Sequence, residues 1–146
     1  DGVIMVLGAV YVVFFAADFI GPFQGFLITL GVPVAAWCGI VLADIALRRR
    51  DYADAELYDV TGRYGDVRWS AIVIVVGATV VGWGLVTNSL AGWLSWQGYL
   101  LDLGLGGREG PWAYANLGVL LALVLGFVVT LATSSGTVRR QDRVAA

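Results

Sequence analysis

The feature that most constrains this chain is the length of its apolar stretches that carry no charge. Residues 71–101 contain no Asp, Glu, Lys or Arg, and residues 3–47 contain only Asp18 and Asp44. An uncharged apolar run of about 18 residues or more can cross about 30 Å of hydrocarbon as a helix. A water-soluble helix usually keeps a polar face toward solvent instead. The pattern therefore predicts an all-α membrane protein.

Composition narrows the functional classes further. Hydrophobic residues make up 59% of the chain and charged residues only 14%, against about 25% charged residues in soluble domains. The sequence has no histidine and one cysteine, Cys38, which excludes a Ser-His-Asp triad, a histidine-based metal site and an internal disulfide. We therefore expect no enzymatic activity, no metal site and no cofactor.

Turn residues, charges and tryptophans divide the apolar sequence into four expected membrane spans. Gly21-Pro22 is expected to close the first span, because proline favours the first turn of a new helix and disfavours helix before it. Arg48 to Arg50 stop the second, and Trp69 marks an edge of the third. The predicted spans are 3–19, 22–47, 69–93 and 111–135, with a loop at 48–68 and a tail at 136–146.

Arginine placement predicts the orientation of these spans. Five arginines lie in loop 48–68 and three in the tail, whereas Arg108 is alone between the third and fourth spans. Short loops rich in arginine face the cytoplasm. We therefore expect loop 48–68 and the C-terminus to be cytoplasmic, in a multi-pass protein of the cell (plasma) membrane.

Small residues recur every four positions on two of the spans. This spacing places them on one face of a helix, where it lets helix backbones approach closely in lipid. The second and fourth spans must therefore pack against partner helices. The two ridges are Gly31, Ala35, Gly39 and Ala43, and Gly118, Ala122, Gly126, Thr130 and Ser134.

The second span contains a proline, Pro33. Proline removes one backbone hydrogen bond and clashes with the preceding turn, so a kink or local unwinding is expected there. In lipid the freed carbonyl needs a partner from a neighbouring helix or a wet cavity. The nearby polar residues Gln24 and Thr29 fit either a substrate path or hydrogen bonding within the bundle.

Other polar residues attached to the spans have two interpretations each. Asp18 and Asp44 fit a proton or ion site, since carboxylates inside a membrane are costly. They also fit structural roles near span ends, where Asp44 can reach Arg48 one helical turn later. The Thr-Asn-Ser run at 87–89 is expected at a solvated interface.

The order of motifs in the chain resembles the nucleobase:cation symporter-1 family, the purine and cytosine permeases. The resemblance covers residues 3–143. Ile45, where many members carry tyrosine, and Asp51-Tyr52 in place of Tyr-Asp leave the subfamily open. The motifs are Phe23 to Gly31, Pro33, Gly39 to Asp44, Arg48 to Tyr52, Leu57-Tyr58, Tyr64 to Trp69, Ala115 to Leu120 and Val138 to Gln141.

This resemblance implies a twelve-helix transporter with two inverted five-helix repeats, of which the chain would be helices 9–12, a C-terminal piece of a longer protein. It implies import of a nucleobase-like molecule coupled to Na⁺ or H⁺, with the main substrate and ion sites on preceding helices. Its expected partners are therefore the substrate, lipid and those helices, and no nucleic acid. The second span would act as a mobile gate. The expected gate residues are Gln24, Leu27, Thr29, Leu30 and Pro33.

A small four-span membrane protein with a structural or assembly role is the alternative interpretation. The smooth helix faces created by the small-residue ridges fit this role without any substrate path.

Overall fold

The computed structural model of the protein describes residues 2–48 and 68–144, and its regular elements in these two ranges are all helical. Helix α1 spans Gly2–Leu47, α3 spans Trp69–Gly84 and α4 spans Leu117–Val144. Residues 85–116, which we call the connecting segment, contain the short 3₁₀ helices η1 (Gly92–Leu94) and η2 (Leu101–Leu103). The predicted all-α class is confirmed for these residues.

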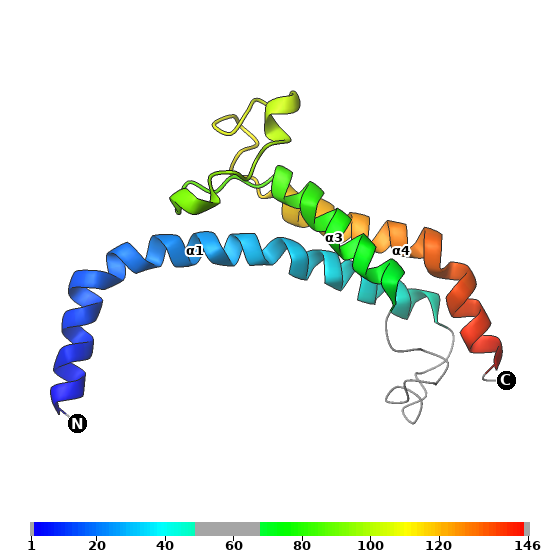
Figure 1. Ribbon diagram of the computed structural model, residues 1–146, viewed down its shortest axis with the longest axis horizontal. Coiled ribbons are helices and arrows are strands. Elements are labelled where there is room, and N and C mark those ends of the chain that lie inside the picture. Colours follow the sequence, from blue (N-terminus) through cyan, green and yellow to red (C-terminus); the bar gives the residue numbers. More distant parts are fainter. Residues whose placement is uncertain (1, 49–67, 145–146) are drawn as a thin grey trace.

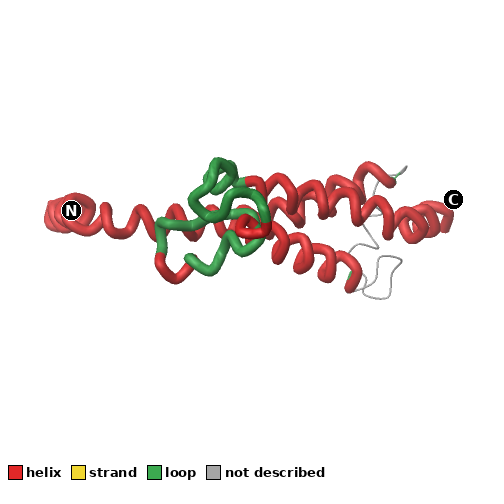
Figure 2. Tube along the Cα trace, turned by 90° about the horizontal axis from the view of Figure 1, so that it is seen from above, coloured by secondary structure: helices red, strands yellow, loops and turns green. Residues whose placement is uncertain are grey.

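The three long helices form a bundle at one end of an elongated molecule (Figure 1). Along α1, Val32 meets the end of α3 at Gly82, and Asp44 meets Arg68, which directly precedes α3. Helix α3 therefore runs opposite to α1. Near the start of α4, Gly118 lies beside Gly82, and further on Gly126 lies beside Ala36 of α1. Helix α4 therefore runs in the same direction as α1. Seen from above, the connecting segment gathers over the middle of α1 (Figure 2).

The helix break predicted at Gly21-Pro22 is not present, because α1 is one continuous helix of 46 residues with Pro22 and Pro33 inside it. A helix in an apolar environment satisfies its own backbone groups, so interrupting it is costly unless other donors replace the lost bonds. The expected unwinding at Pro33 is also not seen. The N-terminal, blue part of α1 turns away from α3 and α4 (Figure 1).

The other two predicted spans are displaced. Helix α3 ends at Gly84 instead of residue 93, and α4 begins at Leu117 instead of residue 111 and continues beyond 135. The end of α3 has a physical cause: the backbone N–H groups of Gly98 and Leu100 donate to the carbonyls of Trp83 and Gly84, at 2.9 and 2.8 Å. The connecting segment thus satisfies the carbonyls that the helix leaves open.

Two helices are long and apolar enough to cross a membrane: residues Asp18–Leu47 (30 residues) and Leu117–Val138 (22 residues). Only 33% and 28% of their most apolar stretches are buried, whereas the core helix of a soluble protein would be mostly covered. With 16 residues, α3 is about 24 Å long, less than the hydrocarbon thickness. The predicted cytoplasmic loop lies, except for Arg48 and Arg68, outside the described residues.

Candidate functional site

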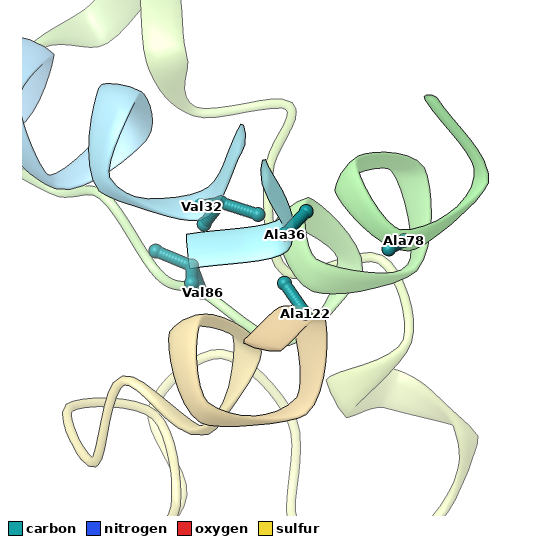
Figure 3. Close-up of a cluster of buried hydrophobic side chains, with 5 residues drawn as sticks. All are labelled: Val32, Ala36, Ala78, Val86 and Ala122. Carbon is teal, nitrogen blue, oxygen red and sulfur yellow. The ribbon is translucent and has the colours of Figure 1, made fainter. Parts of the chain in front are cut away.

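Small side chains line the centre of the bundle. Figure 3 shows the buried apolar cluster, to which α1 contributes Val32 and Ala36, α3 contributes Ala78, α4 contributes Ala122 and the connecting segment contributes Val86. Because three of these five are alanines, the helix axes can approach closely. Such close packing is a main source of helix association in lipid.

Helices α1 and α4 come into backbone contact at Gly39 and Gly126, which we call the glycine interface. A methyl group on Gly39 would overlap the Leu123 carbonyl oxygen and lie 2.9 Å from the Phe127 nitrogen. A methyl group on Gly126 would overlap the Ala36 carbonyl oxygen. The atoms that would be struck belong to the backbone, so no side-chain rotation relieves the overlap.

The other residues of the two predicted ridges also lie toward neighbouring helices. Gly31 is half-buried and the rest are buried. Gly118 contacts α3, since a methyl group there would overlap the Gly82 carbonyl oxygen. The buried ridge residues, besides the glycine interface, are Ala35, Ala43, Gly118, Ala122, Thr130 and Ser134.

One end of the bundle carries three charged residues in contact, Asp44, Arg48 and Arg68, which we call the ion cluster. Asp44 accepts hydrogen bonds from Arg48 Nε at 2.7 Å and from Arg68 Nη1 at 2.8 Å. The side chains of Asp44 and Arg48 are only 10% and 8% exposed. This arrangement joins the C-terminal end of α1 to the start of α3. The contact expected between Asp44 and Arg48 is present, and Arg68 also binds the same carboxylate.

Nearer the middle of α1, Pro33 leaves one backbone carbonyl without its usual donor in the helix, and another side chain supplies the donor instead. Proline lacks an N–H, so the carbonyl four residues earlier, on Thr29, has no partner within the helix. The indole N–H of Trp83 on α3 donates to the Thr29 carbonyl oxygen at 2.9 Å. A neighbouring helix therefore supplies the missing bond, and α1 passes through Pro33 without a break.

The connecting segment brings two amides to the same turn of α1. With Thr29 and Trp83 they make up what we call the polar cluster. Asn88 Nδ2 donates to the Gly25 carbonyl at 2.7 Å, and Gln97 Nε2 donates to the Thr29 hydroxyl at 3.0 Å. Asn88 is 4% exposed and Gln97 1%. The solvated position expected for Asn88 is therefore wrong.

The Thr29 hydroxyl is saturated in this cluster. It donates to the Gly25 carbonyl at 2.9 Å and accepts from Gln97 and, at 3.3 Å, from Asn88. A hydroxyl has one hydrogen to donate and two lone pairs. Gly25 makes the approach possible, because a methyl group at this position would lie 2.7 Å from Asn88 Oδ1. In the polar cluster, the hydroxyl of Thr29 therefore uses all its hydrogen-bonding capacity, and the absence of a side chain on Gly25 leaves room for the Asn88 amide.

The connecting segment is braced by contacts of its own. Arg108 Nη1 donates to the Ser95 carbonyl at 2.7 Å, and its Nε lies 3.5 Å from Asp102. The rings of Trp83 and Trp96 meet edge to face, with centroids 5.4 Å apart. Gln97 therefore directly follows two residues that are held in place: Ser95, whose carbonyl binds Arg108, and Trp96, whose ring contacts Trp83. These contacts position the Gln97 amide.

A cleft of about 240 Å³ opens between α1 and the connecting segment. Gln24 is its polar residue on α1, and Thr87, whose hydroxyl oxygen is buried, lies across from it. A neighbouring hollow of about 230 Å³ shares Thr87 and extends to Arg108 and Glu109. The full lining of the first cleft is Gln24, Ile28, Thr87, Ser89, Leu90, Tyr114 and Asn116.

The structure separates the five predicted gate residues into three groups. Gln24 lines the cleft, while Thr29 and Pro33 belong to the polar cluster and its freed carbonyl. Leu27 and Leu30 are 48% and 45% exposed. They lie on an uncovered side of α1 that we call the open face, which comprises Leu27, Leu30, Val34 and Trp37.

Three polar side chains that hold α1 were not identified from the sequence: Trp83, Gln97 and Arg68. Their partners lie 54, 68 and 24 residues away along the chain, beyond the reach of helical periodicity. One signal was available for Trp83. Pro33 identifies the Thr29 carbonyl as an acceptor in need of a donor, and an indole N–H near the end of another span is a candidate for it.

Comparison with known proteins adds no relative. No protein-family model, curated protein or solved structure matches this chain.

Proposed function

We propose that this chain is a membrane-embedded part of a secondary active transporter that imports a nucleobase-like heterocycle together with Na⁺ or H⁺. The substrate class and the coupling are what the family resemblance over residues 3–143 implies. Substrate and ion would bind mainly on preceding helices of the same protein, and residues 24–33 of α1 would form a gate over the substrate.

The observation that carries the proposal is the combination of Pro33 with a polar cleft on the same stretch of α1. Transporters place interrupted helices beside their substrate paths, because a proline-weakened turn lets one half of a helix move relative to the other. In this chain Gln24 reaches the cleft, and the Thr29 carbonyl that Pro33 frees is bound by the Trp83 side chain instead of by a donor in the helix.

Four crossings, corresponding to helices 9–12 of a twelve-helix transporter, belong to this proposal. They require α1, a helix of 46 residues and therefore about 69 Å long, to divide near Gly21-Pro22. Glycine and proline lower the cost of such a division. The opposite directions of α3 and α4 agree with alternating crossings, and loop 48–68 would face the cytoplasm.

The test is uptake of labelled cytosine and purines by the full-length protein, in cells that lack their own permeases. The proposal predicts uptake above that of the empty vector for at least one nucleobase, dependent on a Na⁺ or proton gradient. Verified membrane insertion with no uptake of any nucleobase would contradict it.

A bulky substitution on the proposed gate sharpens this test. Leu27→Trp, on the open face, is expected to reduce the uptake rate at least about fivefold if this face meets the rest of the transporter. Leu120→Trp on α4 is the matched control, since Leu120 is 62% exposed. Equal uptake by the two variants would argue against a gate at residues 24–33.

A role in assembly is the second candidate, and the open face of α1 favours it. Leu30, Val34 and Trp37 are between 45% and 59% exposed, which suits a surface that packs against other membrane helices as well as one that meets lipid. Intact uptake in the experiment above would remove this alternative as the main function.

A further inference from the structure

Val86 of the connecting segment packs in the apolar cluster with Val32 of α1, but around Gly25 and Thr29 the segment is tied to α1 by polar groups, and this contact differs from the helix packing around it. Asn88 and Gln97 reach Gly25 and Thr29 by side-chain hydrogen bonds. One turn earlier on α1, Gly21 has no side chain, and a methyl group placed on it would lie 3.7 Å from the Leu90 carbonyl oxygen. Because glycines supply no side chain to bury, little apolar area holds the segment to this part of α1.

Hydrogen bonds of this kind are suited to reversible contact. A neutral hydrogen bond shifts a folding or conformational equilibrium by only about two- to tenfold, because water or another partner replaces it on opening. The glycine interface, about ten residues further along α1, behaves differently. Its contacts are between backbone atoms. Side-chain rotation therefore cannot open this interface, and only separation of the two helices can.

Pro33 lies between these two regions. When Trp83 donates to the Thr29 carbonyl, α1 is continuous through the proline. When that donor withdraws, the turn from Thr29 to Pro33 has one helical bond fewer than an ordinary turn and bends more easily. The Trp83 side chain therefore affects how stiff α1 is, and its ring also contacts Trp96 in the connecting segment, directly before Gln97.

We propose that the polar cluster is a latch, in which Asn88 and Gln97 are positioning residues that hold residues 25–33 of α1 against the connecting segment and the end of α3. Release of the latch lets this part of α1 move about Pro33 while the glycine interface stays closed. Only the link between this movement and transport rests on the proposed function; the movement itself does not.

The test measures cysteine reactivity at two depths in the bundle of the full-length protein in its membrane. In a Cys38→Ala background, Val32→Cys places a thiol where the wild-type residue is 0% exposed, next to the latch. Ile40→Cys places one where the residue is 6% exposed, beside the glycine interface. Labelling rates with N-ethylmaleimide report how often each position opens.

Asn88→Leu keeps the branched shape of the side chain, Gln97→Leu shortens it by one heavy atom, and both remove the amide. Each is expected to raise the labelling rate at position 32 about fivefold or more, with less than a twofold change at position 40. Leu103→Ala is the control, because Leu103 lies in η2 of the same segment and is 79% exposed. It should alter neither rate.

Two results would overturn the latch. Unchanged labelling at position 32 in both variants would show that the amides do not hold α1, and equal increases at positions 32 and 40 would show that they brace the whole bundle. Hydrogen–deuterium exchange gives the same contrast without a cysteine: faster exchange in residues 25–33 only is expected.

Uptake kinetics separate this inference from the proposed function. If the function holds, the two amide variants change the maximum uptake rate and Leu103→Ala does not. Absence of any nucleobase uptake would remove the transport proposal and leave the labelling contrast standing. Normal uptake with unaltered labelling would remove the latch alone.

Discussion

The two ends of the helix bundle are held together by different kinds of contact. Around Gly39 and Asp44, α1 is fixed by backbone contacts with α4 and by a poorly hydrated carboxylate shared between two arginines. Around Thr29, α1 is fixed by neutral hydrogen bonds from an irregular segment. The backbone contacts and the buried ion pairs are costly to break, because no other group can take the place of a lost partner. The neutral hydrogen bonds are weaker, because water or another polar group can replace a lost partner. The comparison locates mobility at the polar cluster and rigidity at the ion cluster and glycine interface.

The largest effect is expected from Asp44→Asn in the ion cluster. It removes the negative charge that two guanidinium groups share where the Arg48 and Asp44 side chains are only 8% and 10% exposed. Breaking one side of such a buried arrangement costs about 3 kcal/mol or more. The free energy of unfolding in detergent micelles, from a denaturant titration, measures it.

Asp102→Asn provides the matched control. Its partner Arg108 is 3.5 Å away, with side chains 55% and 41% exposed, so solvent screening keeps the loss within about 0.5 kcal/mol. Similar losses for the two variants would show that the end of the bundle near Asp44 is hydrated, and the contrast between the two ends would weaken.

A smaller effect is expected from Gly39→Ala at the glycine interface. The added methyl group would overlap the Leu123 carbonyl oxygen, so α1 and α4 must separate, at a cost of about 2 kcal/mol for overpacking. On α3, Gly77→Ala adds the same group with nothing within 4 Å. That variant should be neutral or gain up to about 1 kcal/mol from helix propensity. A gain in stability for both variants would contradict the close approach of α1 and α4.

Trp83→Phe tests the other end of the bundle. It retains an aromatic ring and removes the N–H that the Thr29 carbonyl accepts, which leaves a carbonyl without a donor at a cost of about 1–2 kcal/mol. In a Pro33→Ala background residue 33 regains its own N–H for the same carbonyl. The cost of Trp83→Phe should then fall below about 0.5 kcal/mol.

This double-mutant cycle has a definite failure. If Trp83→Phe destabilises the Pro33→Ala protein as much as the wild type, the indole contributes packing only. The turn before Pro33 would then not depend on Trp83.

The sequence determined the helical class well and its local interruptions poorly, for reasons that these residues make clear. Uncharged apolar length is a local property, so helices around 22–47 and 111–135 were expected, and four-residue spacing identified Gly39 and Gly126. Gly21-Pro22 was predicted as a break because proline favours the first turn of a new helix and disfavours helix before it, but α1 continues through it. The end of α3 at Gly84 depends on hydrogen bonds from Gly98 and Leu100, which no local pattern contains.

The candidate site divides in the same way. Pro33 was recognised because proline removes a helical hydrogen bond wherever it lies inside a helix, and Thr29 because it is a polar side chain close to Pro33. Asn88 was placed in solvent because a polar residue near a span end is usually hydrated. Its burial requires the glycine at position 25, which clears room for the amide on another helix. Pairings of this kind across 60 residues become visible only once the chain is folded.

The smallest effect, and the narrowest test of the comparison, comes from two threonines in the same helical arrangement. Thr29 and Thr133 each donate a hydroxyl hydrogen to the carbonyl four residues earlier, at 2.9 and 2.7 Å. Thr133 is exposed, whereas Thr29 also accepts from Asn88 and Gln97. Valine at position 133 should change the free energy of unfolding by no more than about 0.5 kcal/mol. Valine at position 29 should cost about 1 kcal/mol more, because two buried amides lose an acceptor. Equal losses would mean that the backbone bond alone matters, and the polar cluster would then be no stronger a tie than an isolated hydroxyl on a helix surface.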